Sequence, residues 1–251
     1  MAANPRPFAA FDIDGTLIRW QLYHAMANAL VKKQAIDKNQ YLAVLKQRDN
    51  WKNRKENNSF VRYEESLIRL LDKALIGIDY DLFKETCAEV VERYRGQVYT
   101  YTRDLINDLK QQNYLLFAIS TSPAELVKLV ADYYGFDDYG ASSYQIQANR
   151  LTGRAEILYG NAKAKRLEQL ISRHRATFSG SLAVGDTEGD VPMLESAETA
   201  ITFNPSLKLF NLAIIRHWEI VIERKNVVYH LQYSHGEYVL APTEKHRTAV
   251  R

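Results

Sequence analysis

The most constraining feature of the sequence is a short apolar run that ends in two carboxylates. Residues 8–14 read Phe-Ala-Ala-Phe-Asp-Ile-Asp, and the turn pair Gly15-Thr16 follows at once. Because the run is apolar up to its first Asp, it predicts a strand that is buried on both faces. Burial on both faces is typical of a strand inside a parallel sheet. The start of the chain therefore favours an α/β fold.

The second half of the sequence alternates strand and helix patterns. Strands are expected at 113–119, 181–184 and 198–203, helices at 123–134 and 163–174, and a β-hairpin at 142–157. This alternation predicts a Rossmann-like parallel sheet with helices on both faces.

The intervening segment has a different character. Residues 17–100 show apolar positions at helical spacing and no convincing strand, which predicts a helical cap inserted after the first strand. We therefore expect three parts: an α/β core from residues 1–16 and 101–232, a helical cap from residues 17–100, and a polar C-terminal tail from residues 233–251.

Composition excludes several classes of protein. The 33 basic and 30 acidic residues leave a net charge of +3 without a concentrated basic face, so no nucleic-acid partner is expected. The one cysteine, Cys87, excludes an internal disulfide and a multi-thiolate zinc site. No apolar run is long enough for a signal peptide or a membrane span, so we expect a cytoplasmic protein without integral membrane contact. The oligomeric state stays open.

Polar side chains follow each predicted core strand. Asp12 and Asp14 end the first strand, Ser120 and Thr121 follow the second, and Asp186 follows the third. Open α/β sheets place their sites at the carboxyl ends of the strands, so these residues are expected to converge. Several carboxylates at one place repel one another unless a cation lies among them.

The residue types at this edge indicate phosphoryl transfer. Residues two apart in an extended segment point to the same side, so one of Asp12 and Asp14 can attack a substrate while the other donates a proton. Together with Asp186 they form an all-oxygen site of the kind that Mg²⁺ prefers. Ser120, the backbone N–H of Thr121 and the Lys163 ammonium suit a phosphate. This set predicts phosphoryl transfer through an aspartyl-phosphate.

The motifs resemble those of the haloacid dehalogenase (HAD) superfamily. Residues 11–17 (Phe-Asp-Ile-Asp-Gly-Thr-Leu) are similar to its first signature, and Ser120, Lys163 and residues 185–190 (Gly-Asp-Thr-Glu-Gly-Asp) look like the other three in order. The helical insertion resembles the cap of the phosphoserine-phosphatase-like branch, subfamily IB. The resemblance implies a Mg²⁺-dependent phosphatase with Asp12 as nucleophile and Asp14 as general acid and base. It also implies that Asp12, Asp186 and the backbone carbonyl of Asp14 hold the metal. Asp190 is then expected to orient the lysine without contacting the metal or the substrate itself.

Some assignments remain alternatives at this point. Lys165 competes with Lys163 for the phosphate lysine, although the helix spacing to Leu167 favours Lys163. His24 is interpreted as a surface or partly packed histidine, with a cleft-facing position as the alternative. The basic stretch 46–55 is interpreted as a solvated face, or else as a rim that attracts an anionic substrate or a membrane surface.

The cap departs from the phosphoserine phosphatases in the residues expected to bind the substrate. Where those enzymes carry a Glu and an Arg, this chain offers Gln21 and Leu70, with Arg62 and Arg69 only nearby. We therefore expect a small phosphorylated metabolite as the substrate, such as histidinol phosphate. The alternatives are a phosphatase of a phospholipid head group or lipid intermediate, and a non-catalytic phosphate-binding regulator on the same fold.

Overall fold

A computed structural model describes residues 5–56, 59–225 and 227–241 of the chain. In this part of the chain, one nine-stranded sheet has the strand order β4-β3-β2-β1-β5-β6-β7-β8-β9. The six strands from β3 to β7 are parallel, and β4, β8 and β9 add antiparallel pairs at the two edges. The strands are β1 Pro7–Phe11, β2 Leu115–Pro123, β3 Asp138–Gln147, β4 Arg150–Glu156, β5 Thr177–Gly185, β6 Thr199–Phe203, β7 Glu219–Arg224, β8 Val227–Ser234 and β9 Glu237–Leu240. The expected α/β fold with a mostly parallel sheet is confirmed.

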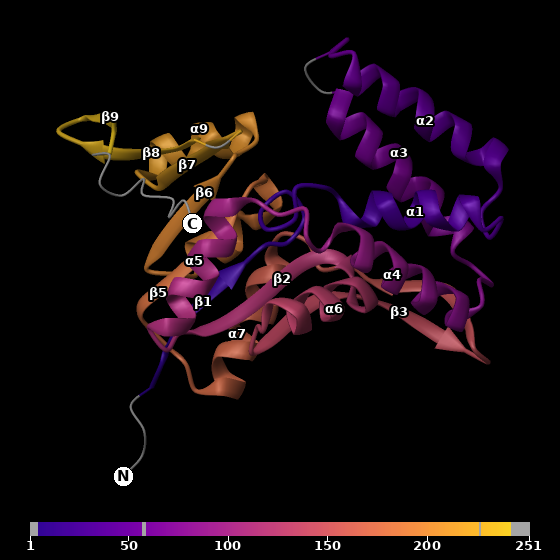
Figure 1. Cartoon of the computed structure of the whole chain (residues 1–251), viewed down its shortest axis with the longest axis horizontal. Coiled ribbons are helices and arrows are strands. Elements are labelled where there is room, and N and C mark those ends of the chain that lie inside the picture. The colour runs from indigo at the N-terminus through magenta and orange to yellow at the C-terminus, as the bar shows by residue number, and fades with distance from the viewer. Residues whose placement is uncertain (1–4, 57–58, 226, 242–251) are drawn as a thin grey trace.

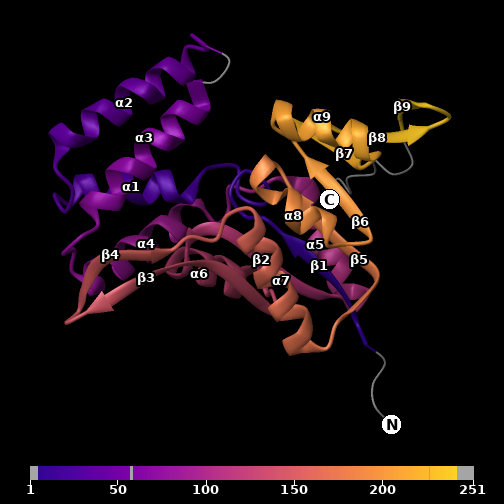
Figure 2. The same ribbon diagram turned by 180° about the vertical axis from the view of Figure 1, so that it is seen from behind.

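Helices cover both faces of the sheet (Figures 1 and 2). Ala9 and Phe11 of β1 lie in the same apolar core as helices α5 and α6, whereas Phe8 and Ala10 lie in the core of α7, α8 and α9. This alternation is why the first strand is apolar at every position. The helices of the sheet layers are α5 Thr100–Gln111, α6 Ala124–Tyr134, α7 Asn161–His174, α8 Val191–Glu195 and α9 Leu207–Arg216, and the short 3₁₀ turn η1 spans Glu188–Asp190.

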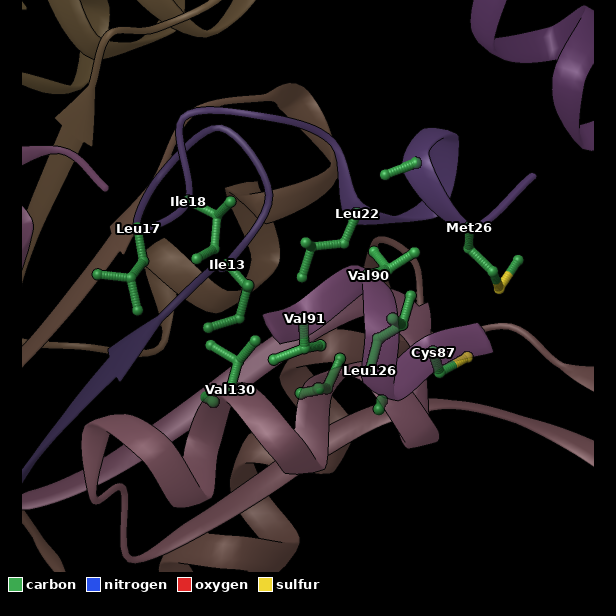
Figure 3. Close-up of a cluster of buried hydrophobic side chains, with 14 of the residues drawn as sticks. Ile13, Leu17, Ile18, Leu22, Met26, Cys87, Val90, Val91, Leu126 and Val130 are labelled. Atoms are coloured by element: carbon green, nitrogen blue, oxygen red, sulfur yellow. The ribbon is translucent and has the colours of Figure 1, made fainter. Parts of the chain in front are cut away.

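The segment between β1 and α5 is helical and has two parts. Its helices are α1 Leu22–Lys32, α2 Lys38–Lys52, α3 Ser59–Ala74 and α4 Tyr80–Tyr94. Helices α2 and α3 pair with each other and project away from the sheet, while α1 and α4 lie against the core beside α6 (Figure 1). The close-up in Figure 3 shows this second contact, which is made by Leu22 and Met26 of α1, Cys87, Val90 and Val91 of α4, and Leu126 and Val130 of α6.

A strand pair of the core holds the base of the projecting helices. The loop between α3 and α4 pairs with the β3–β4 hairpin, with Gly77 N–H donating to the Leu151 carbonyl at 2.8 Å and Tyr80 N–H to the Asn149 carbonyl at 2.9 Å. Leu151 N–H returns a hydrogen bond to the Ile78 carbonyl at 3.0 Å. The end of α3 and the start of α4 are therefore fixed to the core by backbone hydrogen bonds.

The C-terminal segment differs from the polar tail expected at residues 233–251. Pairing between β8 and β9 continues to Leu240, and the Tyr238 hydroxyl donates to the carbonyls of Ala213 and Trp218 at 2.8 and 2.9 Å. Residues up to 240 thus belong to the sheet, because this tyrosine anchors the hairpin to α9. Residues 242–251 of the expected tail lie outside the described residues. Within the described ranges, no helix combines the length and apolar character needed to cross a membrane.

Candidate active site

The strand order explains why distant residues meet at one edge of the sheet. Strand β1 lies between β2 and β5, and all three run parallel. Their carboxyl ends carry Asp12, Ser120 and Asp186, which therefore lie next to one another as expected for a parallel sheet. The Asp12 backbone N–H continues the ladder by donating to the Val184 carbonyl at 2.9 Å. The first carboxylate is thus held by the end of the sheet itself.

A buried lysine bridges two of the carboxylates. The Lys163 Nζ lies 2.7 Å from Asp12 Oδ1 and 2.5 Å from Asp190 Oδ1, and all three residues are buried. Burial disfavours the charged lysine, but the carboxylates of Asp12 and Asp190 outweigh it and raise the pKa of Lys163 above its ordinary value. Lys165 is exposed on the opposite side of α7, so Lys163, and not Lys165, lies among the carboxylates.

The second carboxylate of the motif accepts three hydrogen bonds. Asp14 Oδ1 accepts from the Leu22 N–H at 2.5 Å, and Asp14 Oδ2 accepts from the hydroxyls of Ser120 and Ser122 at 3.0 and 2.7 Å. Burial raises the pKa of Asp14, and the hydrogen bonds from Ser122, Leu22 and Ser120 oppose that rise. Ser122 was missed by the sequence analysis, which assigned residue 122 no role.

Asp190 shapes the loop that carries Asp186. Its Oδ2 accepts from the backbone N–H groups of Asp186 and Thr187 at 3.1 and 3.0 Å, while its Oδ1 contacts Lys163. Both oxygens of Asp190 are therefore engaged by protein groups, namely Lys163 and the backbone N–H groups of residues 186 and 187. Gly15 (φ +87°) completes the approach, because a Cβ at that position would lie 2.2 Å from Asp186 Oδ2.

The site carries an excess of negative charge. Burial raises the pKa of Asp12 to about 7, with Asp190 and Asp14 adding to the rise and Lys163 opposing it. Burial, followed by the charges of Asp12 and Asp190, also holds the pKa of Asp186 well above its ordinary value. The raised pKa values of Asp12 and Asp186 indicate that the site holds more negative than positive charge.

The donor set fits a hard divalent cation. Carboxylate oxygens of Asp12, Asp186 and Asp190 all lie within 4.8 Å of one another. Oxygen ligands of this kind suit Mg²⁺. Because Asp190 is already engaged with Lys163 and two backbone N–H groups, Asp12 and Asp186 are the better placed carboxylate ligands.

Two of the three residues predicted for phosphate binding, Ser120 and Thr121, lie on β2, which stays extended to Pro123. Ser120 is buried beside Asp14, as described above. The Thr121 hydroxyl points elsewhere and donates to the Leu158 carbonyl at 2.8 Å, so a phosphate role for Thr121 rests on its backbone N–H. Helix α6 starts directly after this segment and directs its first N–H groups toward the same strand end.

The cap residues considered from the sequence lie in three different settings. Gln21 directly precedes α1 and approaches Gly15, with its Nε2 3.4 Å from the position of a Cβ there. Arg62 and Arg69 are exposed on α3 and pair with Glu56 and Glu65 at 2.8 and 3.7 Å, and Leu70 is half-buried.

The interpretation of His24 as a surface or partly packed residue was wrong. His24 is 3% exposed, and its ring packs against the ring of Tyr63 with centroids 4.6 Å apart. The reason is that α3 folds back over α1, a tertiary contact that the spacing of apolar residues along α1 does not reveal.

Comparison with known proteins assigns the chain to a family. A model of the haloacid dehalogenase-like hydrolases matches residues 9–195, so the chain belongs to this family. Within the family it is similar to the phosphoserine phosphatase branch. It is 28% identical over 148 residues to the phosphoserine phosphatase SerB1 of Mycobacterium tuberculosis and 30% identical over 121 residues to a phosphoserine phosphatase of Streptomyces coelicolor.

These alignments cover 58% and 47% of this chain. The chain spans less than half of the length of either relative, covering 46% of the first and 30% of the second.

Solved structures share the fold more completely. A Bordetella pertussis protein of unknown function has a TM-score of 0.67 and 21% identity, with coverage of 88% of this chain and 99% of that one. A structure described as a phospho-aspartyl intermediate analogue of phosphoserine phosphatase has a TM-score of 0.61 and 20% identity, covering 88% and 95%. At these identities the likeness supports the sheet-and-cap architecture alone.

Proposed function

We propose that this protein is a Mg²⁺-dependent phosphatase that hydrolyses a small phosphomonoester through an aspartyl-phosphate on Asp12. The observation that carries the proposal is the placement of Asp12 beside the Lys163 ammonium, at 2.7 Å, with Asp14 two residues further along the same strand end. A nucleophile, a cation for the transferred group and a second carboxyl for proton transfer are thus together. Family membership and the named phosphatase relatives support the same reaction class.

Two carboxyl groups divide the first step between them. An Asp12 oxygen attacks the phosphorus, the ester P–O bond breaks, and the protonated Asp14 gives its proton to the departing alkoxide oxygen. Burial raises the pKa of Asp14, which favours the protonated form that this step needs. Lys163 stays charged throughout and attracts the oxygens of the transferred phosphoryl group.

The second step reverses the role of Asp14. As a carboxylate it accepts a proton from water, whose oxygen attacks the phosphorus of the aspartyl-phosphate, and the bond to Asp12 breaks to release inorganic phosphate. The hydroxyls of Ser120 and Ser122 stabilise this charged form of Asp14 by donating to its Oδ2. One residue therefore serves as acid and then as base.

The cation and the phosphate have assigned positions in this proposal. Asp12, Asp186 and the backbone carbonyl of Asp14 would hold Mg²⁺, which would offset the excess negative charge and polarise a phosphoryl oxygen. Ser120, the Thr121 N–H and Lys163 bind the substrate phosphate.

A lid role for residues 17–100 belongs to the same proposal. Helices α1 and α4 lie against the core, so opening is assigned to the projecting pair α2–α3. Closure of this pair over the strand ends would exclude water and leave room for a metabolite-sized ester, such as the histidinol phosphate expected from the sequence.

Hydrolysis of p-nitrophenyl phosphate tests the proposal. The protein is expected to be inactive in EDTA and active after Mg²⁺ is added, and Asp12→Asn should lose at least about a thousandfold of the rate, because an amide is not nucleophilic. Asp108→Asn, an exposed position on α5, is the matched control and should keep full activity. Full activity in EDTA, or more than a few per cent in Asp12→Asn, contradicts the proposal.

A further inference from the structure

The loop after β5, residues 186–190, carries one of the proposed metal ligands and is held from two sides. On the inner side, Asp190 Oδ2 accepts from the N–H groups of Asp186 and Thr187, as described above. On the outer side, the Asp186 carbonyl accepts from the Ser206 N–H at 2.8 Å. The peptide groups before and after Asp186 are therefore both fixed, and the outer contact comes from the connection between β6 and α9.

A second contact joins the same two segments through side chains. The Ser206 hydroxyl donates to Glu188 Oε2 at 3.0 Å and accepts from the Leu209 N–H at 3.2 Å. Because the first turn of α9 supplies the donor to this hydroxyl, the hydroxyl hydrogen is free to point at Glu188. Ser206 thus binds the loop at residues 186 and 188, and we call these two contacts the Ser206 clasp.

The segment that carries Ser206 is itself anchored to the sheet. The Asn204 N–H donates to the Val221 carbonyl of β7 at 2.8 Å, and Asn204 Oδ1 accepts from the Glu223 N–H at 2.9 Å. Two hydrogen bonds to a strand restrict the movement of residues 204–206. The Ser206 clasp therefore ties the Asp186 loop to a fixed part of the molecule.

The stability of the fold does not account for Glu188. Its side chain is 36% exposed, and its Oε1 pairs at 3.2 Å with Lys208, whose side chain is 74% exposed. Ion pairs between exposed side chains contribute little to stability. The role of Glu188 is therefore better explained by its other oxygen, which holds Ser206.

Asp186 needs outside support because its neighbours repel it. Carboxylate oxygens of Asp12, Asp186 and Asp190 lie within 4.8 Å of one another, and like charges at this distance favour separation until a cation lies among them. The ammonium of Lys163 contacts the other two carboxylates. In a loose loop, Asp186 would move away from the site. Only the fraction of molecules with Asp186 in place would then bind the metal, and the apparent affinity would fall by that fraction.

We propose that Glu188 is a positioning residue of the metal site: by accepting the hydrogen bond from the Ser206 hydroxyl, it holds the Asp186 loop in the arrangement that binds Mg²⁺. This inference rests on the proposed function, in which Asp186 is a ligand of the metal. It goes beyond that function because it gives a role to a residue that is assigned neither to the metal nor to the substrate. The effect of Glu188 passes through Ser206 to Asp186.

Urea unfolding at rising Mg²⁺ concentration separates metal binding from the stability of the fold. Unfolding in EDTA gives the stability of the metal-free protein, and the gain at each Mg²⁺ concentration gives the Kd of the folded protein. Glu188→Ala should raise this Kd by about 10- to 100-fold, the range typical of residues that orient metal ligands. Its urea midpoint in EDTA should stay close to that of the wild type, because an exposed ion pair contributes little.

Two further variants separate the contact from the charge. Glu188→Gln removes the charge but keeps an oxygen that accepts from Ser206, so it should restore most of the wild-type affinity for Mg²⁺. A loss as large as that of Glu188→Ala would assign the effect to long-range charge and overturn the proposal. Glu195→Ala is the matched control, since Glu195 is 40% exposed and pairs with Arg216 at 2.9 Å, and it should leave the Kd unchanged.

Ser206→Ala tests the path from Glu188 to Asp186. This variant keeps the backbone N–H but loses the hydroxyl, which also caps α9, so some stability should be lost in EDTA. Its Kd for Mg²⁺ should rise as in Glu188→Ala. Combining the two substitutions should raise the Kd no further, because both remove the same contact. Effects that multiply in the double variant would show that Glu188 acts by another path and would contradict the proposal.

Failure of this inference and failure of the proposed function give different results. A wild-type Kd in Glu188→Ala overturns the inference even when the wild-type protein hydrolyses p-nitrophenyl phosphate. A Kd that depends on Glu188 in a protein without that hydrolysis supports the positioning role and contradicts the phosphatase. If Mg²⁺ neither stabilises the wild-type protein nor activates it, both are overturned.

Discussion

The strand-end site and the interior of the cap, between helices α1, α2 and α3, both contain buried titratable groups, but the two regions differ in how the polar atoms are paired. At the strand ends, Lys163 contacts two carboxylates, and both oxygens of Asp190 are engaged. In the cap, Arg48 and His24 have polar atoms that no described residue satisfies. The first region is held together by contacts among its own charged groups, whereas the second keeps two buried nitrogen atoms without a hydrogen-bond partner among the described residues.

The two regions also respond to pH in opposite directions. The folded-state pKa of Asp12 is raised to about 7, so its contribution to stability is present below the ordinary value of 3.8 and is lost as the pH rises toward 7. The folded-state pKa of His24 is lowered to about 4, so its contribution is present above 6.5 and is lost as the pH falls toward 4. The metal-free protein should therefore show two opposing contributions within the same pH range.

The largest effect is expected from breaking the lysine bridge. Lys163→Met leaves Asp12 and Asp190 buried without their shared cation, so the free energy of unfolding should fall by about 3–5 kcal/mol and turnover should be lost. Lys165→Met, at an exposed position, should change stability by less than about 0.5 kcal/mol. Denaturant unfolding gives both values. If Arg48→Met destabilised the protein as much as Lys163→Met, the contrast between the two regions would be wrong.

Metal removal should expose the charge excess of the strand-end site. In EDTA, the free energy of unfolding should fall between pH 4 and 7 by on the order of 4 kcal/mol through Asp12, because each pKa unit corresponds to about 1.4 kcal/mol. Added Mg²⁺ should reduce this fall, since it binds the folded site. Urea titrations at several pH values, with Asp12→Asn as the variant that lacks the titrating group, measure it. If the pH dependence of the free energy of unfolding is the same with Mg²⁺ and in Asp12→Asn, the site does not carry the excess negative charge.

The cap should contribute a smaller pH dependence of the free energy of unfolding than the strand-end site, and of opposite sign. His24→Gln removes a buried imidazole that resists protonation beside Arg48 and the ring of Tyr63. The wild-type free energy of unfolding should fall by up to about 3 kcal/mol more than that of the variant between pH 6.5 and pH 4, because only the wild type has to protonate this imidazole on unfolding. The same urea titrations at descending pH measure the change. His235→Gln, at an exposed position, should retain the wild-type acid dependence. Equal behaviour of the two variants would mean that His24 does not resist protonation.

The smallest effect is expected at Asp14. Ser122→Ala removes a hydroxyl that stabilises the carboxylate, so the pKa of Asp14 should rise and the alkaline limb of kcat/KM for an alkyl phosphate should move upward by a fraction of a pH unit. With p-nitrophenyl phosphate, whose leaving group needs little protonation, the limb should move less. An equal shift for both substrates would place the effect of Ser122 on a group other than Asp14.

Sequence patterns predicted the part of the site that depends on the ends of strands. Asp12, Asp14, Ser120 and Asp186 meet because β2, β1 and β5 are adjacent and parallel. The alternation of strand and helix patterns indicated the parallel sheet, but not the order of its strands. Ser122 was missed because the second strand was expected to end at residue 119, whereas β2 stays extended to Pro123. In an extended segment residues 120 and 122 point to the same side, and both therefore reach Asp14.

The cap was less predictable because its internal contacts are tertiary. The helices could be read from their spacing, but which faces of α1, α2 and α3 pack together could not. The positions of His24 and Arg48 follow from that packing and from no local pattern. The β8–β9 hairpin escaped prediction for a related reason, since Tyr238 anchors it through the backbone of α9 and the following residues.

Direct detection of the covalent intermediate tests the central claim, which is that Asp12 is the nucleophile of a phosphatase. Wild-type protein mixed with a phosphomonoester and Mg²⁺, quenched in acid within one turnover and digested, should carry one phosphoryl group on the peptide that contains Asp12. Asp12→Asn should carry none, and Asp14→Asn should accumulate the adduct from p-nitrophenyl phosphate because its hydrolysis lacks a base. A phosphoryl group on any other residue, or rapid turnover without an adduct, would contradict the account.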